Sequence, residues 1–210
     1  MKTKYVLPLA CLALSLALGA FACSDNGEEE VDDVGVDTDS PPEDAAPAED
    51  APSGPFPAVV SPSLWSQIDA EDDPLEDHRP AEVDCPADAI KTEVLDGDSS
   101  YAVDMENCNY LAVSQPSLTD IEEGDTLRAR IWHFTLTPPP GEDSAEAHAA
   151  ILFNGQIAWE STVEIPADGQ LLSPEWEAEQ DYPVGTDVVF HLHNHGDNQW
   201  NFIELSRIRN

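Results

Sequence analysis

Residues 147–162 read AHAAILFNGQIAWEST, and this stretch decides the fold class. Asn154-Gly155 stands between two runs that are rich in apolar residues. The Asn-Gly pair is favoured in two-residue hairpin loops, because both central positions of a type I′ turn need positive φ angles. The stretch therefore predicts an antiparallel hairpin with strands at 147–153 and 156–164.

The same pattern continues on both sides of this hairpin, from Ala89 to the end of the chain. Apolar and polar residues alternate, turn signals recur about every ten residues, and no long stretch has a helical period. Seven more strands are expected at 90–95, 100–104, 108–114, 126–136, 169–173, 186–194 and 200–208. Nine short strands joined by such turns predict an all-β fold, a two-sheet antiparallel sandwich of the jelly-roll kind.

Two features of this region carry a resemblance to known domains. Gly124-Asp125 comes directly before a long expected strand, and the last strand contains Trp200-Asn201-Phe202-Ile203-Glu204-Leu205. In this order of features, residues 90–208 resemble the jelly-roll sandwiches of galactose-binding-like and carbohydrate-binding modules. The resemblance implies a fold more than a function, since one fold hosts many functions.

Residues 57–210 are expected to form a single domain of ordinary size. Within it, residues 57–84 are rich in Pro, Asp and Glu. We expect this segment to wrap the surface as a loop, with Trp65 and Ile68 docking on the sandwich.

The first 22 residues have the pattern of an export signal. Lys2 and Lys4 precede an apolar run at 5–22, and small residues gather at its end. The chain then becomes acidic at once, without the basic flank of a stop-transfer segment. These features predict a cleaved signal peptide at 1–22.

The end of this segment, Leu18-Gly19-Ala20-Phe21-Ala22-Cys23, resembles a bacterial lipobox. The resemblance implies that Cys23 carries diacylglycerol on its thiol and that cleavage occurs before it. More than one acyl chain would then hold the protein on a membrane. Ser24 in place of Asp favours the outer membrane, with the domain facing the periplasm or the surface. The alternative is an ordinary secretory signal followed by a stray cysteine.

The segment after Cys23 is strongly acidic. Residues 24–56 contain twelve Asp or Glu and no Lys or Arg, in a chain of net charge -35. Such a composition cannot bury enough apolar surface to offset its ordering entropy, so 23–56 is expected to be a disordered tether. The charge also excludes nucleic acid as a partner, because the chain would repel phosphates.

Two cysteines remain for the folded domain, Cys85 and Cys108. An even pair in an exported domain predicts one disulfide. The alternative is a pair of free thiols, which an oxidising compartment disfavours.

Five of the six histidines fall on expected strands or directly after one: His133, His148, His191, His193 and His195. Alternate residues of a strand share a face, so the last three project together. Imidazoles at this spacing are used in Zn²⁺ and Cu²⁺ sites, and His133 or His148 could supply a third ligand. The alternative is that these histidines are structural, hydrogen-bonded to backbone groups.

A second hypothesis is sugar binding near residues 191–200. Asn194, Asp197 and Asn198 offer groups that could bond hydroxyls, and Trp200 offers a flat ring. Other aromatic candidates are Trp132, Trp159 and Trp176. Against this, a Trp on a sandwich strand usually belongs to the core.

Catalytic motifs are missing from the sequence: it has no G-x-S-x-G, no H-E-x-x-H and no Gly-rich phosphate loop. We therefore expect a non-catalytic, membrane-anchored domain that binds a ligand such as a carbohydrate at the cell envelope. One alternative is a metal-binding lipoprotein. The other is a structural or adhesive envelope protein without a small ligand.

Overall fold

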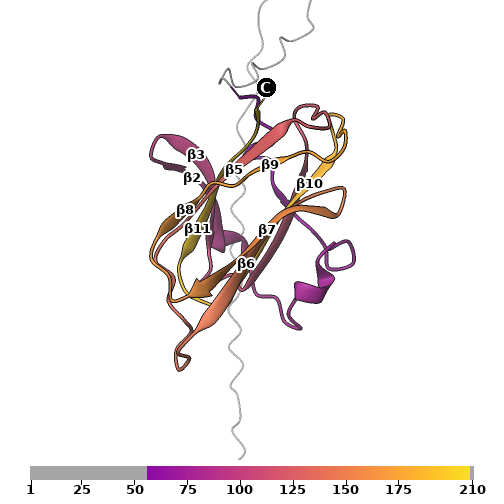
Figure 1. Ribbon diagram of the computed structural model, residues 1–210. Coiled ribbons are helices and arrows are strands. Elements are labelled where there is room, and N and C mark those ends of the chain that lie inside the picture. Colours follow the sequence, from indigo (N-terminus) through magenta and orange to yellow (C-terminus); the bar gives the residue numbers. More distant parts are fainter. Residues whose placement is uncertain (1–55, 209–210) are drawn as a thin grey trace, which may run out of the picture. The chain divides into compact units, whose positions relative to one another are not determined.

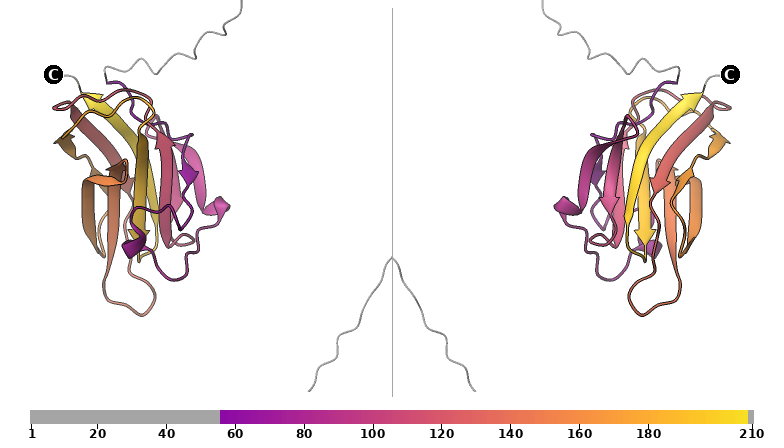
Figure 2. Two further views of the ribbon diagram at one scale, coloured as in Figure 1. Left: turned by 90° about the vertical axis from the view of Figure 1, so that its right-hand side faces the viewer. Right: turned by 90° about the vertical axis from the view of Figure 1, so that its left-hand side faces the viewer.

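The computed structural model describes residues 56–208, which form two antiparallel sheets packed face to face (Figures 1 and 2). One sheet has the strand order β1-β4-β10-β6-β7. The other has the order β2-β3-β11-β5-β8, and β9 pairs with β5 beside β8. The prediction of an all-β, two-sheet antiparallel sandwich is confirmed.

The strands of the five-stranded sheet are β1 (Ser66–Gln67), β4 (Tyr110–Pro116), β10 (Asp187–Asn194), β6 (Ala145–Phe153) and β7 (Gln156–Ile165). Those of the six-stranded sheet are β2 (Ile90–Leu95), β3 (Asp98–Asp104), β11 (Gln199–Ile208), β5 (Thr126–His133), β8 (Gln170–Leu172) and β9 (Glu175–Glu177). Two short 3-10 helices, η1 (Glu76–His78) and η2 (Ala87–Ala89), precede β2.

The hairpin predicted around Asn154-Gly155 is present as β6 and β7. Phe153 pairs with Gln156, and φ is 48° at Asn154 and 75° at Gly155. These positive φ angles are the reason why this pair of residues suits the turn.

Alternation of side chains builds the core between the sheets. In β5 every second residue is buried, from Leu127 to His133, while the intervening residues lie on the outer face. Strand β10 differs, because nearly all of its residues are buried, on the outer face as well. Something must therefore cover β10 from outside.

The cover is the segment 68–84, which we call the strap. It carries η1 and is the purple segment that lies beside the sandwich in Figures 1 and 2. Leu75 and Ile68 from the strap pack with Ala150, Leu152 and Val189 in a small apolar cluster. The expected docking of Ile68 on the sandwich is thus confirmed, and Trp65 packs against the main core.

The predicted disulfide between Cys85 and Cys108 is present. It ties the chain just after the strap to the chain just before β4. The strap is therefore a loop with both ends fixed at the same strand, since β1 at its other end pairs with β4.

The predicted signal peptide 1–22, the lipidation site Cys23 and all but the last residue of the tether 23–56 lie outside the described residues. Between residues 56 and 208, no helix is both long and apolar enough to cross a membrane.

Candidate metal centre

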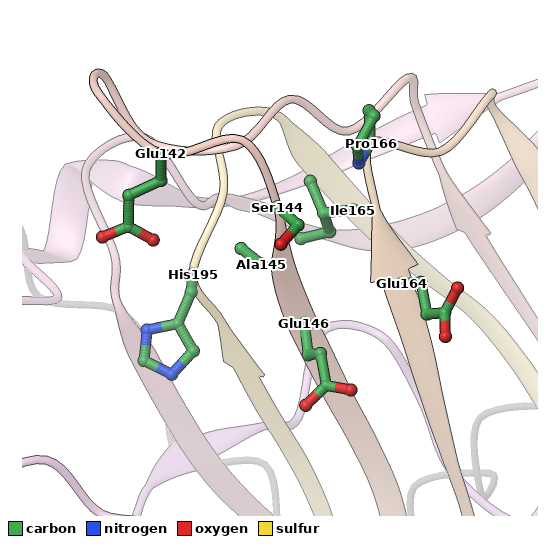
Figure 3. A pocket seen from close by; sticks show the side chains of 8 residues that line it. All are labelled: Glu142, Ser144, Ala145, Glu146, Glu164, Ile165, Pro166 and His195. Carbon is green, nitrogen blue, oxygen red and sulfur yellow. The ribbon is translucent and has the colours of Figure 1, made fainter.

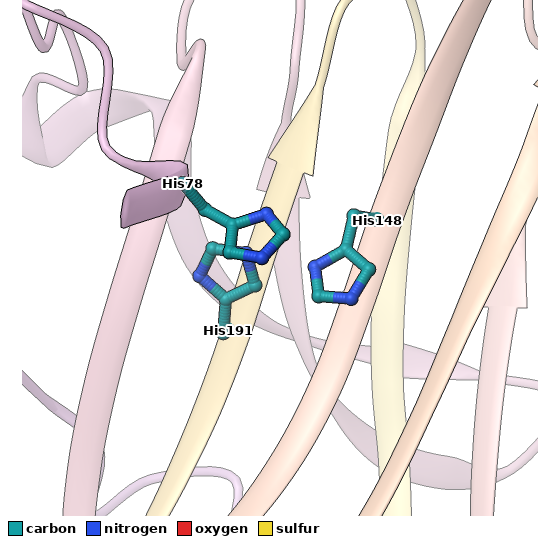
Figure 4. Close-up of side chains that lie close together, drawn as sticks. All are labelled: His78, His148 and His191. Atoms are coloured by element: carbon teal, nitrogen blue, oxygen red, sulfur yellow. The ribbon is translucent and has the colours of Figure 1, made fainter. Parts of the chain in front are cut away.

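Three imidazoles meet on the outer face of the five-stranded sheet, beneath the strap (Figure 4). They belong to His78 at the end of η1, His148 on β6 and His191 on β10. One ring nitrogen from each lies within 4.8 Å of the other two. Three atoms this close together can all lie within about 2.8 Å of one common point, roughly 0.7 Å beyond the bonds of about 2.0–2.1 Å that metal–imidazole sites use.

Strand register brings His148 and His191 together. His191 pairs with Ala112 on one side and Ala150 on the other, while His148 lies diagonally across on β6, opposite His193. Neighbours two residues apart in register remain within reach of long side chains. The two small alanines leave space above His191, and the strap places His78 there.

Three buried ring nitrogens of this cluster lack hydrogen-bond partners within residues 56–208. His191 is fully buried, and neither of its ring nitrogens has a hydrogen bond. The Nδ1 atom of His148 is also buried without a partner. Buried polar atoms without partners cost about 1–3 kcal/mol each, so such atoms need an explanation.

The other nitrogen of His148 is oriented by a carboxylate. His148 Nε2 lies 3.1 Å from Glu160 Oε2 on β7. When Nε2 carries the proton and donates to Glu160, the lone pair of Nδ1 is free to face His191. Histidines that bind metals are usually held in this way, with the second nitrogen donating to a carboxylate.

Burial keeps the ring of His191 neutral. Burial lowers the pKa of His191 to about 3, and the neighbouring His148 and His78 act in the same direction. Burial likewise lowers the pKa of His193 to about 4, and the neighbouring His195 is the second cause of this lowering. Neutral imidazole is the form that coordinates metal ions, so His191 is in its binding form at neutral pH.

A second group of polar residues holds η1 beside the cluster. The Tyr110 hydroxyl donates to Asp73 Oδ2 at 2.6 Å, and Arg79 Nη1 lies 2.8 Å from the same oxygen. Burial alone would raise the pKa of Asp73, but the hydrogen bonds from Tyr110, Leu75 and Arg79 together hold it below its usual value. The Tyr110 ring meets His191 edge-on, with centroids 5.0 Å apart.

The structure brings together only part of the predicted histidine set. His148 and His191 belong to the cluster, and His193 and His195 lie next to it, with their ring centroids 4.2 Å apart. His133 lies elsewhere: it belongs to the six-stranded sheet and points into the core, against Trp200. Its Nδ1 atom lies 2.9 Å from the carbonyl oxygen of Phe134. The expectation that His133 could complete a metal site is corrected accordingly.

Sequence reasoning missed His78, the third member of the cluster. It lies in a Pro- and acid-rich segment without periodicity, so no pattern indicates which way its side chain points. The only available cue was that it is the sixth histidine in a chain with few of them.

The residues predicted for sugar binding are occupied in other ways. Trp200 is fully buried in the core, so its ring offers no platform to a ligand. Asn194 is buried, and its side-chain amide bonds both backbone groups of Gly196. Asp197 pairs through its backbone with Thr137. The Asn198 side-chain amide donates to the Thr135 carbonyl, and its side-chain oxygen accepts from the backbone amide of Gln199. These residues therefore hold the 194–199 turn, which corrects the expected location of a sugar site.

An aromatic and amide surface is found instead on the outer face of the six-stranded sheet. Trp132 is partly exposed there and pairs in register with Asn201 and Leu171. The Asn201 amide donates to Glu93 at 2.8 Å and accepts from Gln199 at 3.0 Å.

A hollow of about 690 Å³ lies near one end of the five-stranded sheet (Figure 3). His195 and the exposed carboxylates of Glu142, Glu146 and Glu164 line it. These acidic groups face solvent and can be hydrated there, whereas the three-histidine cluster is covered by the strap.

Comparison with known proteins gives a likeness in fold. No protein-family model matches the chain, and no curated protein sequence matches it. Among solved structures, the mannan-recognising carbohydrate-binding module TmCBM27 is 8% identical, with a TM-score of 0.43 over 72% of this chain and 94% of that one.

Two further structures have a similar likeness. The N-terminal cellulose-binding domain of Cellulomonas fimi β-1,4-glucanase C is 13% identical, with a TM-score of 0.37 over 60% of this chain and 93% of that one. A cleaved adhesin domain of Lys-gingipain from Porphyromonas gingivalis is also 13% identical, with a TM-score of 0.38 over 73% and 94%. These likenesses concern the sandwich alone, and nothing about the site is taken from them.

Proposed function

We propose that this protein binds a divalent transition-metal ion, Zn²⁺ or Cu²⁺, through His78, His148 and His191. The observation that carries the proposal is the convergence of three ring nitrogens within 4.8 Å of one another, two of the rings having buried nitrogens without partners. Imidazole is a preferred ligand of both metals. A bound ion would satisfy one nitrogen of His191 and one of His148 that the fold otherwise leaves buried without a partner.

The geometry requires only a small adjustment. In a tetrahedral site with Zn–N bonds of about 2.0–2.1 Å, ligand nitrogens lie about 3.3 Å apart. The nitrogens therefore need to approach by at most about 1.5 Å, which ring rotations can supply. Since tetrahedral Zn²⁺ takes four ligands, a water molecule or an external group would complete the shell.

Calorimetric titration and thermal melting of the full chain with Zn²⁺ and, separately, Cu²⁺ test the proposal. At about one hundred times Kd the ion stabilises the fold by about 2.7 kcal/mol. For a domain of this size that raises Tm by about 5–10 °C. His148→Gln should abolish the shift, and His195→Gln, outside the cluster, should retain it. Equal melting of the wild type with and without both metals would refute the proposal.

The place that we propose for this site is the cell envelope. The lipobox-like residues 18–23 support lipidation at Cys23, and Ser24 supports delivery to the outer membrane. The acidic segment 24–56 would then separate the domain from the membrane. Radiolabelled palmitate should label the wild type and leave Cys23→Ser unlabelled, and the variant should move to the soluble fraction. Labelling that persists in Cys23→Ser would argue against this anchor.

A second candidate function is glycan binding on the outer face of the six-stranded sheet. It is favoured by Trp132, a partly exposed ring on the same face as the partly exposed amide of Gln199. Aromatic faces with neighbouring amides suit sugar rings and their hydroxyls. Trp132→Ala should reduce retention on a glycan array without lowering Tm. Trp200→Ala is the contrast, because removal of this core ring should destabilise the domain.

A further inference from the structure

We infer that the metal ion acts as a latch that fastens the strap, residues 68–84, to the five-stranded sheet. The inference rests on the proposed metal binding and concerns what that binding does. Two of the three ligands, His148 and His191, belong to the sheet, whereas His78 belongs to the strap. An ion bound to all three therefore joins two parts of the chain that are otherwise held by few contacts.

Both ends of the strap are fixed independently of the metal. At the first end, β1 pairs with β4, and the Ile68 amide donates to the Ala112 carbonyl at 3.0 Å. At the second end, Cys85 is joined to Cys108, and the Asn109 side chain bonds Asp84 and Glu82. Loss of the metal would therefore free the middle of the strap and leave its ends in place.

The middle of the strap is weakly held within the described structure. Only Asp73 and Leu75 of the strap are buried. Among residues 56–208, the backbone hydrogen bonds made within 69–83 are internal to the strap. Contact with the sheet rests mainly on the hydrogen bonds of the Tyr110 hydroxyl with Asp73 and Leu75, on the Arg79 guanidinium over the Tyr110 ring, on the small cluster around Leu75 and on the approach of His78.

Opening of the strap has a definite consequence for the sheet. It would uncover the side chains of Ala150, Leu152 and Val189, together with the fully buried His191. The concentration of free metal in solution would thus set the fraction of molecules in which the strap covers this apolar face. Segments held by few buried contacts are those that open locally, well below the free energy of global unfolding.

The size of the effect follows from the loss of one ligand. When the strap is open, only His148 and His191 remain as ligands, and they form a weaker site. Metal therefore favours the closed strap by the ratio of the affinity of the three-ligand site to that of the two-ligand site. Loss of one imidazole of three is expected to weaken binding by at least about tenfold, and strap opening should become rarer by the same factor at saturating metal.

Hydrogen exchange of the full chain, read by mass spectrometry over residues 69–82, tests the latch. The samples are the chelator-treated protein and the protein with saturating Zn²⁺. In the wild type, Zn²⁺ should slow exchange in this segment at least about tenfold. In His78→Gln the segment should exchange at the fast, metal-free rate in both samples. His195→Gln, directly after β10, is the matched control and should keep the slowing.

Calorimetry on the same samples tests metal binding separately from the effect of the metal on the strap. Zn²⁺ that binds the wild type and leaves exchange over 69–82 unchanged would overturn the latch while the metal site stands. Zn²⁺ that does not bind at all would overturn both. Slowing that persists in His78→Gln would also overturn the latch, because the strap would then be fastened without its ligand. Unchanged melting of metal-free His78→Gln would confirm that the variant folds.

Discussion

His191 shows how a single residue can reveal a binding site. Its ring is fully buried, and both of its nitrogens lack partners in the part of the chain that the structure describes. If this ring only filled space, an apolar side chain could take its place without any loss of stability. The cost of keeping an imidazole there is explained if it binds a ligand that the protein meets in solution.

Replacement of this ring tests that explanation directly. His191→Leu removes two unpartnered nitrogens and keeps an apolar side chain of comparable volume. The metal-free variant should be more stable than the wild type by about 1–2 kcal/mol, and its Zn²⁺-dependent rise in Tm should be lost. Urea unfolding and thermal melting measure the two effects.

His133→Leu is the matched comparison, because His133 is equally buried but is within hydrogen-bond distance of Phe134. It should lose stability and keep its response to Zn²⁺. If His191→Leu also lost stability, the ring would have a structural role that its unpartnered nitrogens do not suggest.

In the proposed site, Glu160 would contribute through His148 and not by direct contact with the ion. Its carboxylate holds His148 Nε2 at 3.1 Å and leaves Nδ1 for the metal. Glu160→Gln should weaken Zn²⁺ binding by about 10–100-fold, the usual effect of losing such an outer partner. Isothermal titration calorimetry measures the Kd.

Glu164→Gln controls for the change of charge. Glu164 lies on the same strand and the same face, four residues away, and pairs in register with Glu146. An equal loss of affinity in both variants would mean that Glu160 acts through its charge alone and does not position His148.

Among the structural elements, the strap and the 147–162 hairpin represent two extremes of predictability. The hairpin follows from Asn154-Gly155 and from the apolar runs beside it, all of them local features. Two short strands, β1 and β9, were not predicted, because two or three residues are too few for a period to be recognised. The strap follows no pattern at all, and its place depends on the side chains it meets.

The disulfide fixes the strap at its second end. Joint replacement of Cys85 and Cys108 by serine should lower the free energy of unfolding by about 3 kcal/mol, because the unfolded chain is no longer closed into a loop by residues 23 apart. Urea denaturation of the metal-free protein measures this value. The wild type treated with a dithiol reductant should behave like the double variant, and a difference between the two would show that the serines themselves disturb the fold.

For the whole molecule, the buried histidines connect stability to pH. The pKa of His191 is lowered to about 3 in the folded protein, while that of an unfolded histidine is about 6.5. Above pH 6.5 the ring is neutral in both states and has no effect. As the pH falls below 6.5 the unfolded chain binds a proton that the folded protein does not, so stability is lost.

The measurable outcome is a difference between two proteins. In metal-free solution, the stability advantage of His191→Leu over the wild type should grow as pH falls from 6.5 towards 4, by at most about 1.4 kcal/mol for each pH unit. Because both proteins share the same acidic surface, the comparison cancels the loss of carboxylate repulsion in acid. A constant difference across this range would show that His191 titrates normally in the folded protein.

The sequence by itself determined the strand type of the domain, its central hairpin, the Cys85–Cys108 pair and the histidine-rich face of β10. These follow from neighbours along the chain, through side-chain alternation, the φ preferences of a turn and the count of cysteines. Only the tertiary structure decided which histidines meet: it placed His133 in the other sheet, His148 diagonal to His191, and His78 above both. That outcome depends on strand order and on the path of the strap, because packing between distant segments sets both and no local period records it.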